Sequence, residues 1–318
     1  MSSVQPLPGK HLAYAVLALG VLIVSSSSIL VRYAQGAGLS SLTIAALRLG
    51  LAALILTPLA LARASAEILA LSRRDLSLGL AAGGLLAAHF ASWISSLAYT
   101  SVASSTALVT TNPIWIALVS VLVFKERLSS RLILAIAIAV SGSTLIFFAD
   151  DSGAGRVQPN PSFGNLLAVL GAMSVSAYLL IGRQLRRRLS LLTYIWLIYS
   201  TCAILLVAAA LLVGEPLTGF SALAWALLFA LALGPQLLGH TAFNWALNHV
   251  STTFIALTIL GEPIGSALLA LVLFGETFST MQSCGFAALL IGIYLAAVNE
   301  KNRPAKQAEA GTPSAFPD

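Results

Sequence analysis

The sequence predicts an all-α integral membrane protein with ten transmembrane helices, arranged as two inverted five-helix repeats around a central cavity. The first reason is composition. Of the 318 residues, 58% are hydrophobic and 9% are charged, and the mean hydropathy is +0.93, whereas about a quarter of the residues in soluble domains are charged. The other two reasons are that the apolar residues form ten long runs and that the second half of the chain repeats the first.

The ten apolar runs define the predicted helices in order. A bilayer core about 30 Å thick requires roughly 20 apolar residues in a helix. The predicted spans are residues 11–34, 40–62, 76–98, 102–124, 131–149, 163–183, 191–213, 221–247, 250–274 and 280–298. They divide the chain into a cytoplasmic N-terminus (1–10), a first five-helix repeat (11–149), an external linker (150–162), a second, inverted repeat (163–299) and a cytoplasmic tail (300–318). The tail is polar and rich in proline, so we expect it to be disordered.

Lysine and arginine predict the orientation of these spans. All but three of the 17 Lys and Arg residues lie on the same side of the membrane as the N-terminus. The exceptions are Arg32 and Arg156 on the other side and Arg48 within a span. Because cytoplasmic loops carry an excess of Lys and Arg, we expect a protein of the cell (inner) membrane with both termini in the cytoplasm. This explains the net charge of +6 without nucleic acid as a partner, since no basic surface domain exists to bind it.

An offset of about 150 residues aligns the two halves of the chain. "PIWIALVSVLVFKERLS" from Pro113 then meets "PIGSALLALVLFGETFS" from Pro263, with seven of seventeen positions identical. When the offset is increased by one residue, other positions match. These pairs include Gly20 with Gly171, Ser25 with Ser176, Arg32 with Arg183, and His89 with His240. Each unit holds five spans, an odd number, so the second unit must enter the membrane from the opposite side. Inverted repeats are typical of secondary transporters, in which two similar halves exchange which side is open.

The chain resembles the EamA-type ten-helix permeases of the drug/metabolite transporter superfamily. The resemblance covers residues 11 to 299. It rests on the duplication and on three segments, "ALRLGLAALILTP", "YTSVASSTALVTTNPIWIALVSVLVFKERLS" and "LGEPIGSALLALVLFGETFS". It implies a transporter of a small metabolite, with a central cavity framed by helices from both halves. Many members export amino acids or related compounds, so an exporter is favoured. The resemblance does not identify the substrate, because the substrates of the family vary widely.

Arg48 lies inside the second span, about eight residues and therefore about 12 Å from its start. Its guanidinium needs acceptors within the protein because it is too deep to reach water easily. It could anchor a substrate carboxylate, which it matches in bidentate fashion. Alternatively it locks the structure by bonding helix carbonyls or Glu262. The resemblance favours the second role, since a similar arginine recurs in the second helix of members with unlike substrates.

Glu262 precedes Pro263 near the middle of the ninth span, and the matching pair in the first half is Asn112 and Pro113. Proline removes a helical hydrogen bond and bends the helix, so we expect these four residues to serve coupling or gating. The Glu262 carboxylate could carry protons, or it could stabilise the bend by pairing with Arg48. The sequence leaves both roles open.

Two intramembrane histidines, His89 and His240, occupy the same position in the two repeats. His240 belongs to a polar stripe with a spacing of four residues, made of Gln236, His240, Asn244 and Asn248. His89 begins a similar pattern that includes Trp93. Lipid does not tolerate such stripes, so both helices are predicted to turn them toward one shared cavity. The histidines could bind substrate, carry protons or bond a neighbouring helix.

Other polar and aromatic side chains are candidates for the cavity wall. Ser25 belongs to a run of four serines that interrupts the first span, and Tyr178 lies in the sixth. The predicted substrate-binding set is His89, Trp93, His240, Asn244, Gln236, Arg48, Tyr178 and Ser25. Aromatic walls with a few polar points suit a small amphiphilic ligand. Ordinary packing and interfacial position are the alternative explanation for the aromatic residues.

Small residues raise two further questions about packing. Gly261 and Gly265 permit either a close helix crossing or an open backbone that faces the cavity. Ala288, Gly292 and Ala296 in the last span could pack against the fifth span or against another copy of the chain.

The sequence therefore predicts a secondary transporter of a small metabolite such as an amino acid or a related amphiphile. It would work by alternating access around a midplane cavity formed by spans 1, 3, 4, 6, 8 and 9. The alternatives are a static membrane scaffold or a channel and, less favoured, an intramembrane enzyme, for which no catalytic motif is found. Substrate and lipid are the expected partners, and proton coupling and oligomerisation are allowed but not required. Cys202 and Cys284 lie in apolar runs, so no metal or cofactor is expected.

Overall fold

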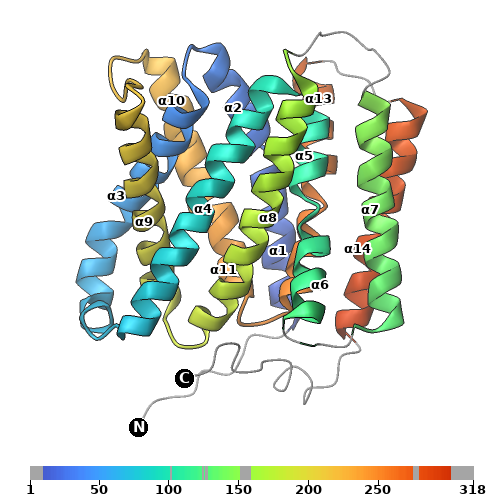
Figure 1. Ribbon diagram of the computed structural model, residues 1–318, viewed down its shortest axis with the longest axis horizontal. Coiled ribbons are helices and arrows are strands. Elements are labelled where there is room, and N and C mark those ends of the chain that lie inside the picture. The colour runs from blue at the N-terminus through green and yellow to red at the C-terminus, as the bar shows by residue number, and fades with distance from the viewer. Residues whose placement is uncertain are drawn as a thin grey trace.

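The computed structural model describes residues 10–100, 102–123, 125, 128–150, 159–274 and 279–301 (Figure 1). The helices of the first half are α1 (Lys10–Ser25), α2 (Ser27–Gly36), α3 (Ser41–Leu69), α4 (Arg73–Tyr99), α5 (Val102–Val109), α6 (Asn112–Leu122) and α7 (Ser130–Asp150). Those of the second half are α8 (Pro161–Arg186), α9 (Leu191–Leu212), α10 (Ala222–Leu231), the π-helix η1 (Ala232–His240), α11 (Thr241–Ala246), α12 (Thr252–Ile259), α13 (Glu262–Phe274) and α14 (Thr280–Lys301). The predicted segment before Lys10, most of the predicted linker 150–162 and the predicted tail beyond Lys301 lie outside the described residues.

Eight helical stretches in the described part of the chain are long and apolar enough to cross a bilayer. They correspond to the first four predicted spans and to spans six to nine. The predicted fifth and tenth spans are helices α7 and α14, whose apolar stretches, Ser130–Leu145 and Ser283–Ala296, are shorter. The all-helical membrane architecture is therefore confirmed, while the count of ten spans stays a prediction.

Serine N-caps set the start of several helices, at matching positions in the two halves. Ser40 Oγ accepts a hydrogen bond from the N–H of Thr43 at 3.1 Å, and Ser190 Oγ accepts one from the N–H of Thr193 at 3.3 Å. The next helices begin in the same way behind Ser72 and Ser221. Each cap satisfies a backbone donor that the first turn of a helix leaves unpaired.

The two halves run in opposite directions through the bundle. Figure 1 shows that α1 begins and α14 ends at the same end of the molecule, whereas α8, which opens the second half, begins at the opposite end. The first helix of each half packs on the third span of the other: α8 on α4, and α1 on η1 and α11. The inversion predicted from an odd number of spans per repeat is thus present in the structure.

Small residues allow the closest of these contacts. A Cβ atom added at Gly171 of α8 would lie 3.4 Å from Cβ of Trp93, and one added at the matching Gly20 of α1 would lie 3.0 Å from the ring of Phe243. Gly265 of α13 meets α1 still more closely, since a Cβ there would lie 2.6 Å from Cβ of Ser25. The glycines of the ninth span therefore serve a close helix crossing.

The last helix of each half forms a pair with its counterpart. A Cβ atom added at Gly142 of α7 would lie 2.6 Å from the carbonyl oxygen of Gly285, and one added at Gly292 of α14 would lie 2.7 Å from Cβ of Ala139. Figure 1 shows α7 and α14 side by side at one edge of the bundle. The small residues of the last span thus pack against the fifth span.

Both fourth spans are broken at the same place. Thr110 and Thr111 separate α5 from α6, and Leu260 and Gly261 separate α12 from α13. The breaks lie just before Pro113 and Pro263, which lack the N–H that would bond the carbonyl four residues earlier. The broken helices bring irregular backbone into the middle of the bundle, where protein rather than lipid can surround it.

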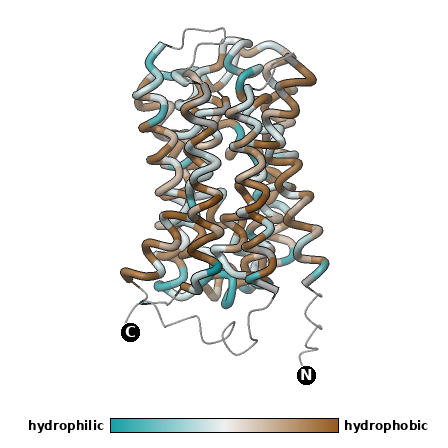
Figure 2. Tube along the Cα trace, turned by 90° about the vertical axis from the view of Figure 1, so that its right-hand side faces the viewer, coloured by the Kyte–Doolittle hydropathy of each residue, from teal (hydrophilic) through white to brown (hydrophobic). Residues whose placement is uncertain are grey.

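The outer surface of the bundle is apolar. Large hydrophobic side chains point away from the core, for example Leu54, which is 70% exposed, and Val272, which is 79% exposed. Figure 2 shows hydrophobic residues along the length of the helices, with hydrophilic stretches gathered mainly toward the two ends. Such a surface suits contact with lipid.

Candidate functional site

A small cavity lies between the two halves. The first half contributes residues of α4, α5, the break after α5, and α6, and the second half contributes residues of α8, η1, α11, α12 and α13. The lining residues are His89, Val109, Thr110, Asn112, Val175, Tyr178, Leu179, His240, Phe243, Asn244, Ile259 and Glu262. No described residue of the first span is among them, although that span was predicted to contribute.

The two histidines line this cavity but have different surroundings. His89 Nδ1 lies 3.0 Å from the carbonyl oxygen of Gly171. Because a carbonyl only accepts, Nδ1 carries the proton of this hydrogen bond. His240 is partly exposed to the cavity and packs against the rings of Phe90 and Phe243, with centroids 5.3 and 5.8 Å away. In the described part of the chain its ring nitrogens have no hydrogen-bond partner.

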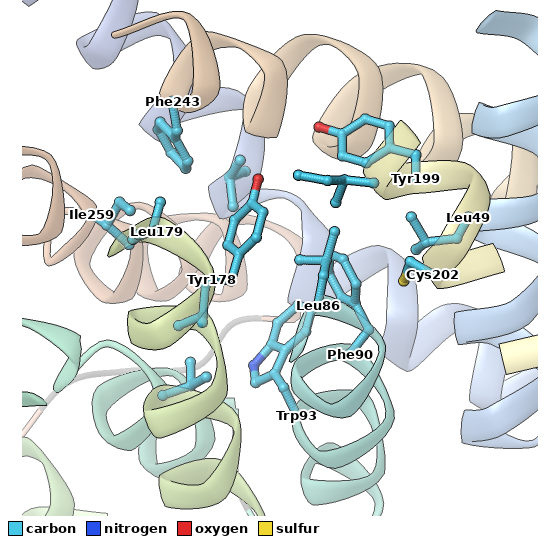
Figure 3. Packing of buried hydrophobic residues seen from close by; sticks show 14 of the residues in the cluster. Leu49, Leu86, Phe90, Trp93, Tyr178, Leu179, Tyr199, Cys202, Phe243 and Ile259 are labelled. Atoms are coloured by element: carbon cyan, nitrogen blue, oxygen red, sulfur yellow. The ribbon is translucent and has the colours of Figure 1, made fainter. Parts of the chain in front are cut away.

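A hydrogen-bonded chain of Tyr178, Asn244 and Tyr199 joins three helices beside the cavity. The Tyr178 hydroxyl donates to Asn244 Oδ1, and Asn244 Nδ2 donates to the Tyr199 hydroxyl at 3.1 Å. Figure 3 shows Tyr178 between Phe243 on one side and the α4 residue Phe90 on the other. The bonds hold the Asn244 amide in one orientation, so this part of the wall is preorganised.

Asn112 and Glu262 occupy equivalent positions and both line the cavity. Glu262 is 6% exposed, and its carboxylate has neither a hydrogen bond nor an ion pair with any described residue. Asn112 is 1% exposed, and its amide oxygen has no partner. Their backbone carbonyls accept long hydrogen bonds from the other half, Glu262 from Ser25 Oγ at 3.4 Å and Asn112 from Ser176 Oγ at 3.3 Å.

Arg48 is fully buried and does not line the cavity. Its Nε donates to Gln236 Oε1 at 3.1 Å, its Nη1 donates to Ser27 Oγ at 2.9 Å, and the guanidinium lies 4.4 Å from the centre of the Phe90 ring. The prediction that the Arg48 guanidinium bonds helix carbonyls or Glu262 was therefore wrong. A guanidinium in a span does need acceptors, but side chains from α2 and η1 supply them.

The predicted polar stripe does not stay on one face. Gln236 bonds Arg48, His240 and Asn244 line the cavity, and Asn248 is exposed beyond the end of α11. The π-helix η1 causes this difference, because its wider turn changes the angle between residues four apart. The spacing of four predicts one face only for a regular α-helix.

Two other predicted substrate-binding residues lie beside the cavity rather than on its wall. Ser25 faces α13, where its carbonyl accepts from Ser266 Oγ at 2.9 Å. Trp93 is 3% exposed, and its ring is stacked 6.1 Å from that of His89. The gating prolines, Pro113 and Pro263, are buried within the first turns of α6 and α13.

Sequence reasoning missed several residues of the wall. Val109 and Ile259 occupy equivalent positions four residues before Pro113 and Pro263, so each proline removes a helical partner from one of their carbonyls. That spacing could have identified them. Thr110, Phe243 and the aliphatic residues of α8 carry no comparable sequence signal.

The comparisons with known proteins agree with this arrangement. Residues 11–148 and 162–298 each match the EamA-like transporter family. A solved structure described only as the crystal structure of a protein is 20% identical, with a TM-score of 0.69, and the alignment covers 92% of this chain and 98% of that one. At this identity the likeness shows the fold alone. No curated protein matches the chain.

Proposed function

Because the chain belongs to the EamA-like transporter family, we propose that it is a secondary transporter that moves a small metabolite, such as an amino acid or a related amphiphile, by alternating access. Membership makes it a membrane transporter of the drug/metabolite transporter superfamily rather than an enzyme. Export from the cytoplasm across the cell (inner) membrane, with both termini inside, is the proposed direction and orientation.

The observation that carries this proposal is the cavity between the inverted halves. Equivalent residues of both halves, His89 with His240 and Asn112 with Glu262, line it. A site lined by equivalent positions of both halves lies where the two inverted units meet, so it can serve as the point around which they exchange access. The breaks before Pro113 and Pro263 are the proposed hinges.

Flux into proteoliposomes tests the proposal. Purified protein is reconstituted and screened with amino acids and related amphiphiles, and we expect saturable uptake of at least one compound. His240→Ala should reduce that uptake with only a small loss of thermal stability, because its ring has no hydrogen bond to lose. Asn248→Ala, on the same predicted stripe but exposed, is the matched control. Ion-rate flux would favour a channel, and no flux would favour a scaffold.

Proton coupling through Glu262 is a separate part of the proposal. An unpaired carboxylate in a cavity is suited to bind and release a proton as access changes. The Glu262→Gln variant retains the shape but cannot ionise. If transport by this variant keeps the pH dependence of the wild type, Glu262 is not the carrier and facilitated transport becomes the better account.

A further inference from the structure

The cavity wall holds one carboxyl group and no basic residue. Glu262 is the only Asp or Glu among the described residues that line the cavity, and none of them is Lys or Arg. Its carboxylate is 6% exposed and unpaired. An ionised carboxylate without a partner is costly in such a site, so a ligand that supplies a positive charge would stabilise the ionised form of Glu262.

Arg48 interacts electrostatically with Glu262 but lies outside the cavity wall. Arg48 is completely buried, it donates to Gln236 and Ser27, and it covers the face of Phe90. It forms no ion pair with Glu262 and presents no surface to the cavity. A substrate carboxylate entering the cavity would therefore meet the Glu262 carboxyl group without a basic side chain in the described wall to bind it.

Two neutral side chains of the wall offer hydrogen-bond acceptors. In a neutral His89 ring, the proton on Nδ1 leaves Nε2 as an acceptor. The Thr110 hydroxyl donates to the carbonyl of Thr106 at 2.7 Å, so it too has only lone pairs to offer. An ammonium group has three donors and no acceptor, which matches this set.

The rest of the wall is apolar and aromatic. Val109, Val175, Leu179 and Ile259 are aliphatic, and Phe243 and Tyr178 add two rings. These side chains suit a hydrophobic body, and the aromatic faces also attract a cation. The wall therefore combines the Glu262 carboxyl group and a few neutral polar groups with a largely apolar and aromatic surface.

We infer that the cavity selects amphiphilic monoamines, with the ammonium group on the Glu262 carboxylate and the apolar body against Phe243 and Tyr178. The inference deepens the proposed function and rests on it, because it takes the cavity as the transport site. It narrows the substrate class to compounds with one net positive charge and places zwitterions and carboxylates of the same shape at a disadvantage.

Three compounds with the same ring and chain test this selectivity: 2-phenylethylamine, L-phenylalanine and 3-phenylpropionate. They differ only in their charged groups. Binding to the purified full-length protein is measured by calorimetry in detergent. We expect the amine to bind about tenfold or more tightly than the other two. Equal or tighter binding of phenylalanine or phenylpropionate, or no binding of the amine, would overturn the inference.

Variants of Glu262 assign the selectivity to this side chain. Glu262→Gln should lose about tenfold or more in affinity for the amine and leave phenylpropionate binding unchanged or stronger. Glu262→Asp should retain the preference, and Glu215→Gln, in the loop between α9 and α10, is the control for a lost carboxylate elsewhere. Should Glu262→Gln fail to fold by thermal unfolding, Asn112→Asp adds a second carboxylate to the same wall and should strengthen amine binding. An unchanged preference in the folded Gln variant, or no gain in the Asp variant, contradicts the assignment.

The flux screen separates this inference from the proposed function. Saturable transport of zwitterions or anions without transport of amines would refute the proposed selectivity for amines but would still support the proposed transporter function. The absence of saturable transport of every compound would count against the function itself.

Discussion

The two halves share a frame but place their irregularities on different helices. In the first half the first span is interrupted at Ser26 and the third span, α4, is continuous. In the second half the first span, α8, is continuous and the third contains the π-helix η1 around Pro235. Only the break before the proline of the fourth span is common to both. The comparison separates symmetric features that hold the frame from asymmetric features that define the cavity.

The symmetric features are mostly hydrogen bonds to backbone. Arg32 Nη2 donates to the carbonyl of Thr100 at 3.4 Å, and Arg183 Nη1 donates to the carbonyl of Val250 at 3.4 Å, so both arginines bond the connection between the third and fourth spans of their own half. The asymmetric features face the cavity, where Glu262 replaces a neutral amide and His240 lacks the bond that His89 makes. The hydrogen bonds that hold the helices together are therefore similar in the two halves, whereas the acidic residue in the cavity wall is present in only one of them.

Moving the charge between the halves is the strongest test of this comparison. Glu262→Asn should weaken amine binding by about 2 kcal/mol, or roughly thirtyfold, because a charged hydrogen-bond acceptor is lost. The double variant Asn112→Glu/Glu262→Asn should recover most of that affinity, since both positions face one cavity. Calorimetry with 2-phenylethylamine measures both. Failure of the double variant to recover, in a protein of normal thermal stability, would show that the two positions are not interchangeable.

Arg48 joins the halves without a symmetric counterpart, since Ile198 occupies the matching position. Arg48→Lys should lower the free energy of unfolding by about 1–2 kcal/mol. A single ammonium group cannot donate to both Gln236 and Ser27 with the geometry of the planar guanidinium. Thermal unfolding in detergent measures the loss, with the exposed Arg63→Lys as the control. A wild-type unfolding temperature for Arg48→Lys would mean that the guanidinium network contributes little.

The two histidines should respond differently to the same substitution. His89→Ala removes the hydrogen bond to Gly171 and should cost about 1 kcal/mol in stability. His240→Ala should cost less than about half of that, and its effect should appear in substrate flux. Unfolding and flux are measured on both variants. Equal losses of stability would indicate that His240 has a structural partner after all.

The smallest expected effects are those of Ser25→Ala and Ser176→Ala. Each hydroxyl shares its proton between a carbonyl of its own helix and, at a longer distance, the carbonyl of the residue before a proline, and such bonds within membranes contribute about 0.6 kcal/mol on average. The two variants should therefore shift the unfolding temperature by similar small amounts. A clearly larger shift for one variant would mean that its serine contributes more to stability than the equivalent serine of the other half.

The sequence by itself determined the features that depend on local pattern. Runs of apolar residues predicted the spans, an odd number per repeat predicted the inversion, and Pro113 and Pro263 predicted the breaks, because each depends on residues close together in the chain. The presence of Asn112 and Glu262 at equivalent positions also followed from the repeat alone.

Only the tertiary structure decided which polar groups meet. The partners of Arg48 come from α2 and η1, far apart in sequence, and the polar stripe lost its common face because η1 is not a regular α-helix. That helix contains Pro235 and lies tightly against α1, where a Cβ atom at Gly239 would lie 2.4 Å from Val24. Spacing along the chain predicts which residues share a helix face only when the number of residues per turn is known. Here that number differs in η1, which packs against the other half of the protein.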